Sequence, residues 1–559
     1  MKILGNKLAR LGLVITAVWL FFFLALDSMV SDSPTMDEQN HLARGAAFVQ
    51  TGDPRLSLEH PPLVNSLSGL PLLLLPDLEL PLNHPSWTLL QPPDVYWYIF
   101  AEQFLWQTEQ DVTQLIFLGR LPIVFLTLGL ALVGFHFARA FWGRPSAYLA
   151  FFLLLFEPNI LANGRLITTD LGGTLFMTLA LLLVWCLWQA PGWQWRRLLA
   201  AGVGLGLAFG SKLSMLTFVP ILVAVAWLPI FNKKSGWLRG VGQRLLQLLG
   251  AGAISVVVVW AIFGFEWGAF RFPSEMLAEL NQFSGPMPTF WAGIDQIVNV
   301  SRGGRAAFLL GETSTDGFWL FFPVAFLVKT PLVLLVGLLG LGWLGWKRPP
   351  SRRRLLYLLI PAILYFGVSI ISGINIGYRH LLPILPLIVV GVSGLPTLFD
   401  EQSVGRSAVT LILAAGILLP SLLIHPHYLS FFNLAAGGPA NGATILADSS
   451  NDWGQDLLRL QAWLAEHEEP SVRLGWFGTA DPAYYHIEFE SMPGYPRPEF
   501  WPLWTNPPFN PENPEPGLYA ISVSSLLEVN WAPRNVYGWF REHEPTDRIG
   551  YSIYIYDLR

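Results

Sequence analysis

The stretch Leu11–Asn40, LGLVITAVWLFFFLALDSMVSDSPTMDEQN, joins a long apolar run directly to a pair of acids, Asp37 and Glu38. About twenty apolar residues are enough for a helix that crosses a bilayer. The basic segment MKILGNKLAR precedes the run, and no small-residue cleavage site follows it. This pattern favours an uncleaved first span over a signal peptide. It predicts a membrane helix with its N-terminus in the cytoplasm and two carboxylates near the far membrane edge.

The composition indicates a membrane protein. Of the 559 residues, 53% are hydrophobic and only 13% are charged, against about 25% charged residues in an ordinary soluble domain. The mean hydropathy is +0.45. The formal net charge is −5, and no basic run is long enough to indicate nucleic-acid binding. The single cysteine, Cys186, excludes an intramolecular disulfide and a cysteine-rich metal site.

Apolar runs of spanning length recur along the first three quarters of the chain. They lie near residues 11–30, 116–138, 146–163, 170–189, 244–264, 319–345, 354–371, 380–397 and 406–424. The stretch 197–230 is too long for one helix, and we interpret it as two spans that meet at Gly210–Lys212. The predicted fold is therefore mainly α, a polytopic transmembrane helical bundle of about eleven spans by this length rule.

Loop charges support this count. With the N-terminus inside, every dense basic cluster falls on the cytoplasmic side, as the positive-inside rule requires. The clusters are Arg139 with Arg144, Arg196 with Arg197, Lys233 and Lys234 with Arg239 and Arg244, and Lys347 and Arg348 with Arg352, Arg353 and Arg354. An odd number of spans then places the C-terminal region outside the cytoplasm.

Three segments are predicted to be extracytoplasmic: 31–114 with interfacial helices, 265–318, and the tail 426–559. The chain thus divides into a transmembrane domain, 1–425, and a small extracytoplasmic α/β domain, 426–559. In the tail, DWGQDLLRLQAWLAEHEE predicts a helix with Asn451 or Asp452 as its N-cap and with Leu457, Leu460 and Leu464 as its apolar stripe. The segments VRLGWFG, GLYAISV and YSIYIYDL predict strands.

The acid pair has two interpretations. Acids favour a helix N-terminus through the helix dipole, so Asp37 and Glu38 are compatible with a simple helix start. His41 and Arg44 would then be solvated partners at helical spacing. The other interpretation is chemical, because further ionisable residues lie on the same predicted face.

These residues stand at the outer ends of separate predicted spans. His60 precedes two prolines in LEHPPLVNSLSGLPLLL, which suits a helix at the membrane interface. Asp170 opens a span, and Arg165 lies close to it in sequence. Arg379 and His380 begin another span, and a charge at that depth is costly unless it is paired or faces a wet cavity. Lys212 raises the same question in FGSKLS. The alternative for each is ordinary: a loop histidine, a helix cap or a snorkelling cation.

Several motifs together resemble a known family. The acid pair after the first span is followed by GD, EHPPL, GRLITTD and GYRHLLPILP, in this order. In the tail, FFNLAAGGP, DSSNDWGQDL and WFGTADPAYY follow. This order resembles the polytopic C-type glycosyltransferases, and in particular the protein O-mannosyltransferase-like family that includes the bacterial lipid A aminoarabinose transferases. His60 stands where the lipid A enzymes typically carry a lysine, which argues against a lipid A acceptor.

The resemblance implies transfer of a sugar, with inversion, from a polyprenyl-phosphate donor to a hydroxyl of a protein, lipid or glycan at a bacterial plasma membrane. It implies catalytic roles for Asp37, Glu38 and Asp170, and donor-phosphate binding by Arg379, His380, Lys212 and Arg165. His60, His41 and Tyr378 would contact the acceptor or support the site. We predict no cofactor and no metal site; whether a divalent metal is required stays open. The alternative function is a secondary transporter or flippase for a lipid-linked sugar, whose site would be expected near the midplane between repeated halves.

Overall fold

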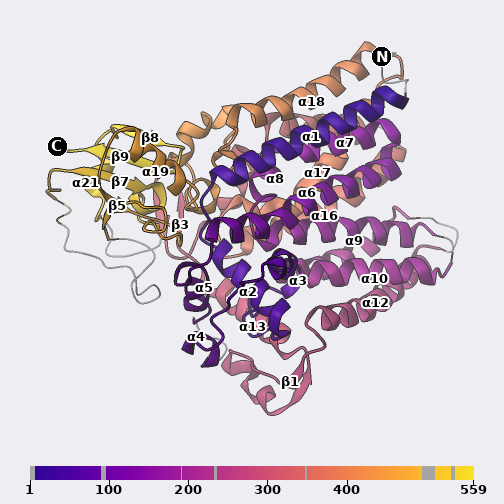
Figure 1. Ribbon diagram of the computed structural model, residues 1–559. Helices are drawn as coiled ribbons and strands as arrows, with labels where there is room; N and C mark the ends of the chain where they lie inside the picture. Colours follow the sequence, from indigo (N-terminus) through magenta and orange to yellow (C-terminus); the bar gives the residue numbers. More distant parts are fainter. Residues whose placement is uncertain are drawn as a thin grey trace.

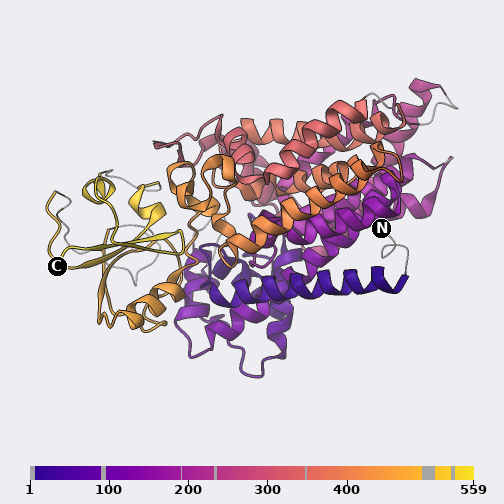
Figure 2. The same cartoon turned by 90° about the horizontal axis from the view of Figure 1, so that it is seen from above.

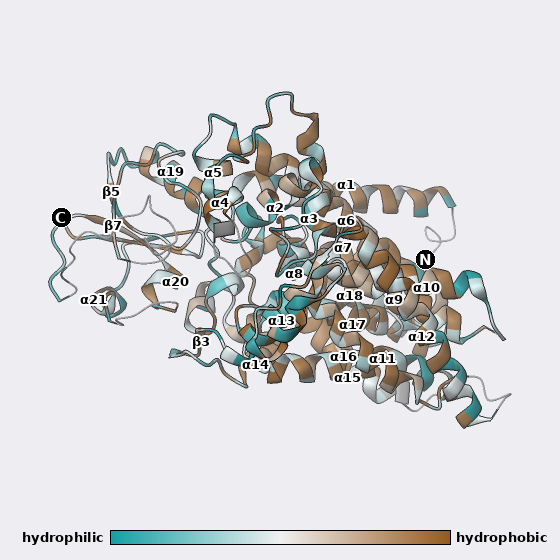
Figure 3. Cartoon of the chain, turned by 90° about the horizontal axis from the view of Figure 1, so that it is seen from below, coloured by the Kyte–Doolittle hydropathy of each residue, from teal (hydrophilic) through white to brown (hydrophobic). Residues whose placement is uncertain are grey.

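The computed structural model describes residues 7–89, 96–190, 192–231, 236–346, 349–493, 510, 512–529 and 535–559. Long helices form a bundle, and the C-terminal region lies at the end of the bundle opposite to the N-terminus (Figures 1 and 2). Hydrophobic residues dominate the long helices, whereas the C-terminal region is mixed (Figure 3). The prediction of a mainly α membrane bundle with a small sheet-containing C-terminal region is confirmed.

Seven helical segments in the described residues are long and apolar enough to cross a membrane. They are α1 (Lys7–Ser31), α6 (Val112–Trp142), α9 (Thr169–Trp188), α12 (Trp237–Ile262), most of α16 (Pro349–Ile371), the segment Tyr378–Leu398 with η5 (Tyr378–Ile384), α17 (Leu385–Val392) and η6 (Leu395–Leu398), and α18 (Val404–Ile424). Of the residues in the most apolar stretch of Tyr378–Leu398, 94% are buried, whereas the share is 22% in the corresponding stretches of α12 and α18. The first therefore runs through the centre of the bundle, and the other two lie at its periphery.

Two predicted spans are broken, and the run 197–230 is broken where the sequence predicts it. The run 319–345 is two helices, α14 (Phe321–Lys329) and α15 (Leu332–Trp346), bent by 104°. Pro331 stands at this break and cannot donate a backbone hydrogen bond. The run 146–163 is split into α7 (Arg144–Phe156) and α8 (Pro158–Asn163). The break predicted at Gly210–Lys212 is confirmed, between α10 (Trp195–Phe209) and the pair η3 (Leu213–Thr217) and α11 (Phe218–Ala226).

The number of membrane crossings stays a prediction. If the bent pair α14–α15 counts as one span, the described residues contain eight segments that could cross a membrane. The sequence predicts about eleven, and the difference arises because the other apolar runs form helices shorter than the length needed to span. Of the basic residues that support the predicted sidedness, Lys233, Lys234, Lys347 and Arg348 lie outside the described residues.

The segment 31–114 folds into short helices against the bundle. They are α2 (Glu38–Thr51), α3 (Pro62–Gly69), η2 (Leu70–Leu74), α4 (Pro85–Thr88) and α5 (Tyr96–Trp106). Helices α2 and α3 cross very closely at two glycines: a Cβ added to Gly45 would lie 1.9 Å from the carbonyl oxygen of Asn65, and one added to Gly69 would lie 2.4 Å from the carbonyl carbon of Gly45. This crossing fixes the orientation of the α2 face that begins at Asp37.

The segment 265–318 contributes two small hairpins and a helix. They are β1 (Trp267–Ala269) with β2 (Ser284–Pro286), η4 (Glu275–Gln282), α13 (Pro288–Gly303), and β3 (Ala307–Leu309) with β4 (Glu312–Ser314). Helix α13 is amphipathic. It packs against the chain between α2 and α3 so closely that a Cβ added to Gly293 would lie 1.9 Å from the carbonyl oxygen of Leu58.

The C-terminal region begins with short turns and then forms a mixed sheet. The turns are η7 (Tyr428–Ser430), η8 (Leu434–Ala436), η9 (Pro439–Thr444) and η10 (Asp448–Ser450). The sheet order is β6-β5-β7-β9-β8, with β5 parallel to β6 and β7, and β9 antiparallel to β7 and β8. The remaining elements are α19 (Leu457–Glu466), β5 (Val472–Gly475), β6 (Phe489–Ser491), β7 (Leu518–Ser522), α20 (Val523–Leu526), α21 (Gly538–Arg541), β8 (Asp547–Ile549) and β9 (Ile553–Asp557).

The predicted strands correspond to β5, β7 and β9, and the predicted stripe Leu457, Leu460 and Leu464 is buried against the sheet. The predicted helix start is wrong. Helix α19 begins at Leu457 and not directly after Asp452. Gly454 lies between them with a left-handed φ of +84°, which is incompatible with a continuous α-helix. The division into domains 1–425 and 426–559 stays a prediction.

Candidate active site

A cavity of about 610 Å³ lies where the segment 31–114, α9, α13, α16 and η5 meet. Its charged and histidine lining comes mainly from α2, the loop before α3, α9 and η5. Its apolar lining comes mainly from η3, α13, α16 and the chain just before η5. The charged and histidine residues are Asp37, His41, Arg44, Glu59, His60, Asp170, Lys212, Arg305, Arg379 and His380. The apolar residues include Leu213, Leu216, Ile294, Ile297, Val298, Val368, Ile371 and Ile376.

Asp37 occupies the N-cap position of α2 but does not cap the helix, because its side chain accepts no hydrogen bond from the first turn. Its carboxylate instead accepts a hydrogen bond from Arg379 Nη1 at 2.8 Å. Burial raises the pKa of Asp37, but the positive charge of Arg379 outweighs it, and the pKa lies below its ordinary value. The side chain keeps 30% of its surface exposed. An ionised carboxylate therefore faces the cavity.

A second ion pair continues from the first. The carboxylate of Asp170, in the first turn of α9, pairs with the ammonium of Lys212, and its other oxygen lies 3.8 Å from Arg379 Nη1. The groups thus alternate in sign in the order Asp37, Arg379, Asp170, Lys212. Both cations are held at the cavity wall by acids, so an incoming anion finds them already oriented.

Three histidines also line the cavity. His41 Nδ1 lies 3.0 Å from Asn65 Oδ1, and His60 Nδ1 lies 3.2 Å from the hydroxyl of Thr169. The rings of His41 and His60 meet edge to face at 4.6 Å. Burial lowers the pKa of His41 to about 4, with a further contribution from Arg44, and burial also lowers the pKa of His60 well below its ordinary value. These two imidazoles are therefore neutral at pH 7. His380 Nε2 is buried with no partner among the described residues.

Glu38 does not line the cavity. Its fully buried carboxylate takes two hydrogen bonds from Arg120, at 2.8 and 2.6 Å, and accepts the backbone N–H groups of Thr35 and Ile167. Burial raises the pKa of Glu38, but Arg120 brings it below its ordinary value. This carboxylate fixes the start of α2 against α6.

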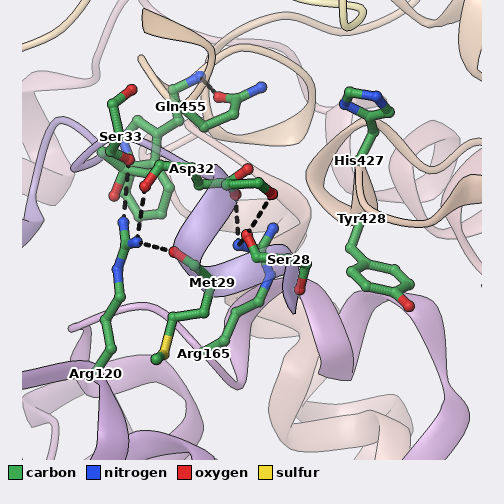
Figure 4. Close-up of polar contacts among 12 residues, drawn as sticks. Ser28, Met29, Asp32, Ser33, Arg120, Arg165, His427, Tyr428 and Gln455 are labelled. Atoms are coloured by element: carbon green, nitrogen blue, oxygen red, sulfur yellow. Dashed lines mark hydrogen bonds and ion pairs between the residues drawn. The ribbon is translucent and has the colours of Figure 1, made fainter. Parts of the chain in front are cut away.

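Arg165 and Tyr378 also lie outside the cavity lining. Arg165 pairs with Asp32 rather than with Asp170, and it donates to the carbonyl of Ser28 at 3.1 Å (Figure 4). The hydroxyl of Tyr378 bonds to the hydroxyl of Thr330 at 2.9 Å, and the side chain is 2% exposed.

Sequence reasoning missed two cations of the cavity. Arg44 is not a solvated partner of Asp37; its side chain is 4% exposed and lies 3.9 Å from Glu59. Its seven-residue spacing from Asp37, two helical turns, carries the signal that both share one face. Arg305 follows α13, and its sequence context shows no signal for the site. No group of three or more metal-ligating side chains among the described residues is arranged to hold a metal ion.

Part of the chain matches a known family. Residues 88–272 match the family model described as dolichyl-phosphate-mannose-protein mannosyltransferase. No curated protein matches the chain. Among solved structures, ArnT from Cupriavidus metallidurans in the apo state is similar, with 13% identity, 98% of each chain covered and a TM-score of 0.49. For the same protein bound to undecaprenyl phosphate, the identity is 14%, the match covers 97% of each chain, and the TM-score is 0.48. For the oligosaccharyltransferase AglB from Archaeoglobus fulgidus, the identity is 14% and the TM-score is 0.42, and the match covers 80% of this chain and 58% of AglB.

The apolar helices and the family match together define a multi-pass membrane glycosyltransferase. The match confirms the resemblance to the protein O-mannosyltransferase-like family that the sequence motifs indicate. The matched region contains Asp170 and Lys212 but stops short of Asp37 and Arg379, so the roles of these residues rest on the geometry of the cavity.

Proposed function

We propose that this protein is an inverting glycosyltransferase that moves a sugar from a polyprenyl phosphate to the hydroxyl of a protein, lipid or glycan acceptor. The observation that carries the proposal is the cavity: it combines oriented cations and an ionised carboxylate with an apolar wall. A lipid-linked sugar phosphate has the same two parts, an anionic head and a hydrocarbon tail. The name of the matched family, which specifies a dolichyl-phosphate sugar, supports a donor of this kind.

The donor phosphate would bind at Arg379 and Lys212, with His380 beside them. An arginine fork suits the geometry of a phosphate, and cations there stabilise the charge that develops as the phosphate leaves. Arg379 Nε is buried and has no partner among the described residues, so one N–H of the fork is left unsatisfied. Because the phosphate is a good leaving group, this step needs no strong general acid.

Asp37 would be the general base. It would take the proton of the acceptor hydroxyl as that oxygen attacks the anomeric carbon, and the bond to the phosphate oxygen breaks on the opposite side. In the structure Asp37 is bound to Arg379. A donor phosphate that competes for Arg379 would release this carboxylate towards the acceptor, so donor binding and base activation are coupled in the proposal.

The remaining candidates would have supporting roles. Asp170 would keep Lys212 and Arg379 oriented for the phosphate, and the neutral His41 and His60 would contact the acceptor. Three residues outside the cavity lining would hold the segments that carry Asp37 and Arg379: Glu38, Arg165 and Tyr378.

We also propose an orientation of the protein in the membrane. The N-terminus would lie in the cytoplasm, and the cavity and the C-terminal region would face the outside of a plasma membrane. The lipid tail of the donor would keep its phosphate at the membrane edge, where Asp37 stands.

The test is transfer by the purified protein in detergent or liposomes with a panel of radiolabelled polyprenyl-phosphate sugars, with and without protein, lipid and glycan acceptors. The proposal expects label in an acceptor-dependent product with at least one donor, and none with Asp37→Asn. Movement of intact lipid-linked sugar between leaflets without any cleavage of the sugar phosphate would instead support the transporter or flippase.

A further inference from the structure

The C-terminal region reaches the candidate active site mainly through the segment Asp448–Arg459, called the tail segment below; outside it, the hydroxyl of Thr479 also donates to the carbonyl of Met36 at 3.1 Å. The tail segment is separated by more than four hundred positions from the chain before Asp37, yet the two are joined by backbone hydrogen bonds. Ser33 N–H donates to the carbonyl of Gln455 at 3.0 Å, and Met36 N–H donates to the carbonyl of Trp453 at 2.9 Å. The hydroxyl of Ser33 donates to the carbonyl of Gly454 at 2.9 Å. These contacts hold the residue that immediately precedes Asp37.

The same segment contacts Arg379. The guanidinium carbon of Arg379 lies 4.1 Å from the ring centroid of Trp453, and Trp453 is 1% exposed. A ring against the face of a guanidinium attracts the cation and leaves its in-plane N–H groups free for anions. One of those N–H groups is the donor to Asp37. Trp453 therefore fixes the plane in which Arg379 presents its hydrogen bonds.

The chain before Arg379 is also held by the tail segment. Tyr378 N–H donates to the hydroxyl of Ser450 at 3.2 Å, and the hydroxyl of Ser449 donates to the carbonyl of Ile376. A Cβ on Gly377 would lie 2.1 Å from the Ser449 hydroxyl oxygen, so the two chains are in close contact here.

Buried ion pairs anchor these contacts to the membrane helices. Asp32, the residue after α1, pairs with Arg165 of the bundle and with Arg459 of the tail segment. Arg120 donates to the carbonyls of Met29, Asp32 and Ser33 (Figure 4). The turn between α1 and α2 is thus clamped between the bundle on one side and the tail segment on the other.

We propose that the tail segment completes the active site and that Trp453 is a positioning residue for Arg379. The proposal rests on the function proposed above, because it assigns Arg379 to the donor phosphate. It gives the C-terminal region a defined role in sugar transfer: one short segment holds both the base and the phosphate ligand, which lie 342 positions apart in the sequence.

The experiment measures the affinity of the purified full-length protein for undecaprenyl phosphate. A cation–π contact is worth about two- to thirty-fold in an equilibrium constant, from exposed to desolvated settings, so Trp453→Leu should weaken binding within that range and towards its upper end. Trp453→Phe, which keeps an aromatic face, should restore most of it. In an Arg379→Ala background, Trp453→Leu should have no further effect, because its action passes through Arg379.

Tyr519→Leu is the matched control. Tyr519 is also fully buried in the C-terminal region and also lies under an arginine, with its ring centroid 5.4 Å from the guanidinium carbon of Arg473. Its loss should destabilise the sheet without changing the affinity of the folded protein for undecaprenyl phosphate. An equal weakening by Tyr519→Leu and Trp453→Leu would show a general structural effect and would overturn the positioning role. Wild-type affinity in Trp453→Leu would also overturn it.

A second measurement separates this proposal from the proposed function. If the wild type fails to bind undecaprenyl phosphate, the assigned donor chemistry fails, but the contact remains testable from thermal unfolding of Trp453→Leu, Arg379→Lys and the double variant. A positioning contact predicts that the two single effects do not add. Additive effects would overturn the inference whatever the protein binds.

Discussion

Replacing Asp37 with asparagine should separate catalysis from folding. The change keeps the size of the side chain and removes its basicity. Loss of a positioned general base costs about 10²–10⁴ in rate, which corresponds to about 3–5 kcal/mol in the activation barrier. We therefore expect the turnover number for sugar transfer to fall by that factor.

The effect of Asp37→Asn on stability should be small. The side chain makes no capping hydrogen bond that could be lost. The carboxylate in the ion pair with Arg379 is 30% exposed and the arginine is 8% exposed, and asparagine keeps an oxygen that can accept the hydrogen bond, so the cost should be about 1–2 kcal/mol, below that of breaking a fully buried pair. Donor affinity should be retained or become tighter, because the phosphate no longer competes with Asp37 for Arg379.

The assay is a single-turnover measurement with a radiolabelled donor, combined with donor binding and thermal unfolding on the same preparation. If Asp37 only marked a helix start, the change would cost a few tenths of a kcal/mol and leave turnover intact, since asparagine is also a good N-cap residue. Near-normal turnover of Asp37→Asn would therefore refute the assignment of the base.

Four further expectations follow from the structure. Arg379→Ala should weaken donor binding more than Arg379→Lys, because lysine keeps the charge but loses the fork; equal affinities of wild type and Arg379→Ala by titration would remove Arg379 from the site. Glu38→Gln should cost about 3 kcal/mol of stability by leaving Arg120 buried without its partner, yet reduce turnover per folded molecule less than Asp37→Asn; denaturation curves and activity of the folded fraction check both. Burial raises the pKa of Asp452 to about 7 from 3.8. The folded state therefore binds this proton more tightly than the unfolded chain, and the free energy of unfolding should fall as pH rises between about 4 and 7. Asp452→Asn should flatten that slope in pH-dependent unfolding, and an unchanged slope would contradict the raised pKa. A C-terminal alkaline phosphatase fusion should be active; an inactive one, with an active cytoplasmic reporter at the same position, would reverse the proposed sidedness.

The amphipathic and apolar patterns predicted most of the architecture, because they depend on local sequence. The first span, the break at Gly210–Lys212 and the strands β5, β7 and β9 are examples. The bend in 319–345 carried its own signal in Pro331, which interrupts backbone pairing.

The site was less accessible to sequence reasoning because its geometry is non-local. The sequence indicates Asp37 and Arg379 separately, but their pairing joins positions 342 residues apart. Arg165 lies five positions from Asp170 and yet turns to Asp32. A sequence pattern gives proximity along the chain, not the direction of a side chain. The role of Trp453 was hidden for a related reason, since the segment around it was interpreted as the start of a helix.

The most direct measurement is the structure of the purified protein in a lipid nanodisc with bound undecaprenyl phosphate. We predict that the phosphate lies within hydrogen-bond distance of Arg379, that Asp37 is released from this arginine, and that the lipid chain runs along the apolar wall formed by η3, α13 and α16. A phosphate bound away from Arg379, with the Asp37–Arg379 pair intact, would contradict this prediction.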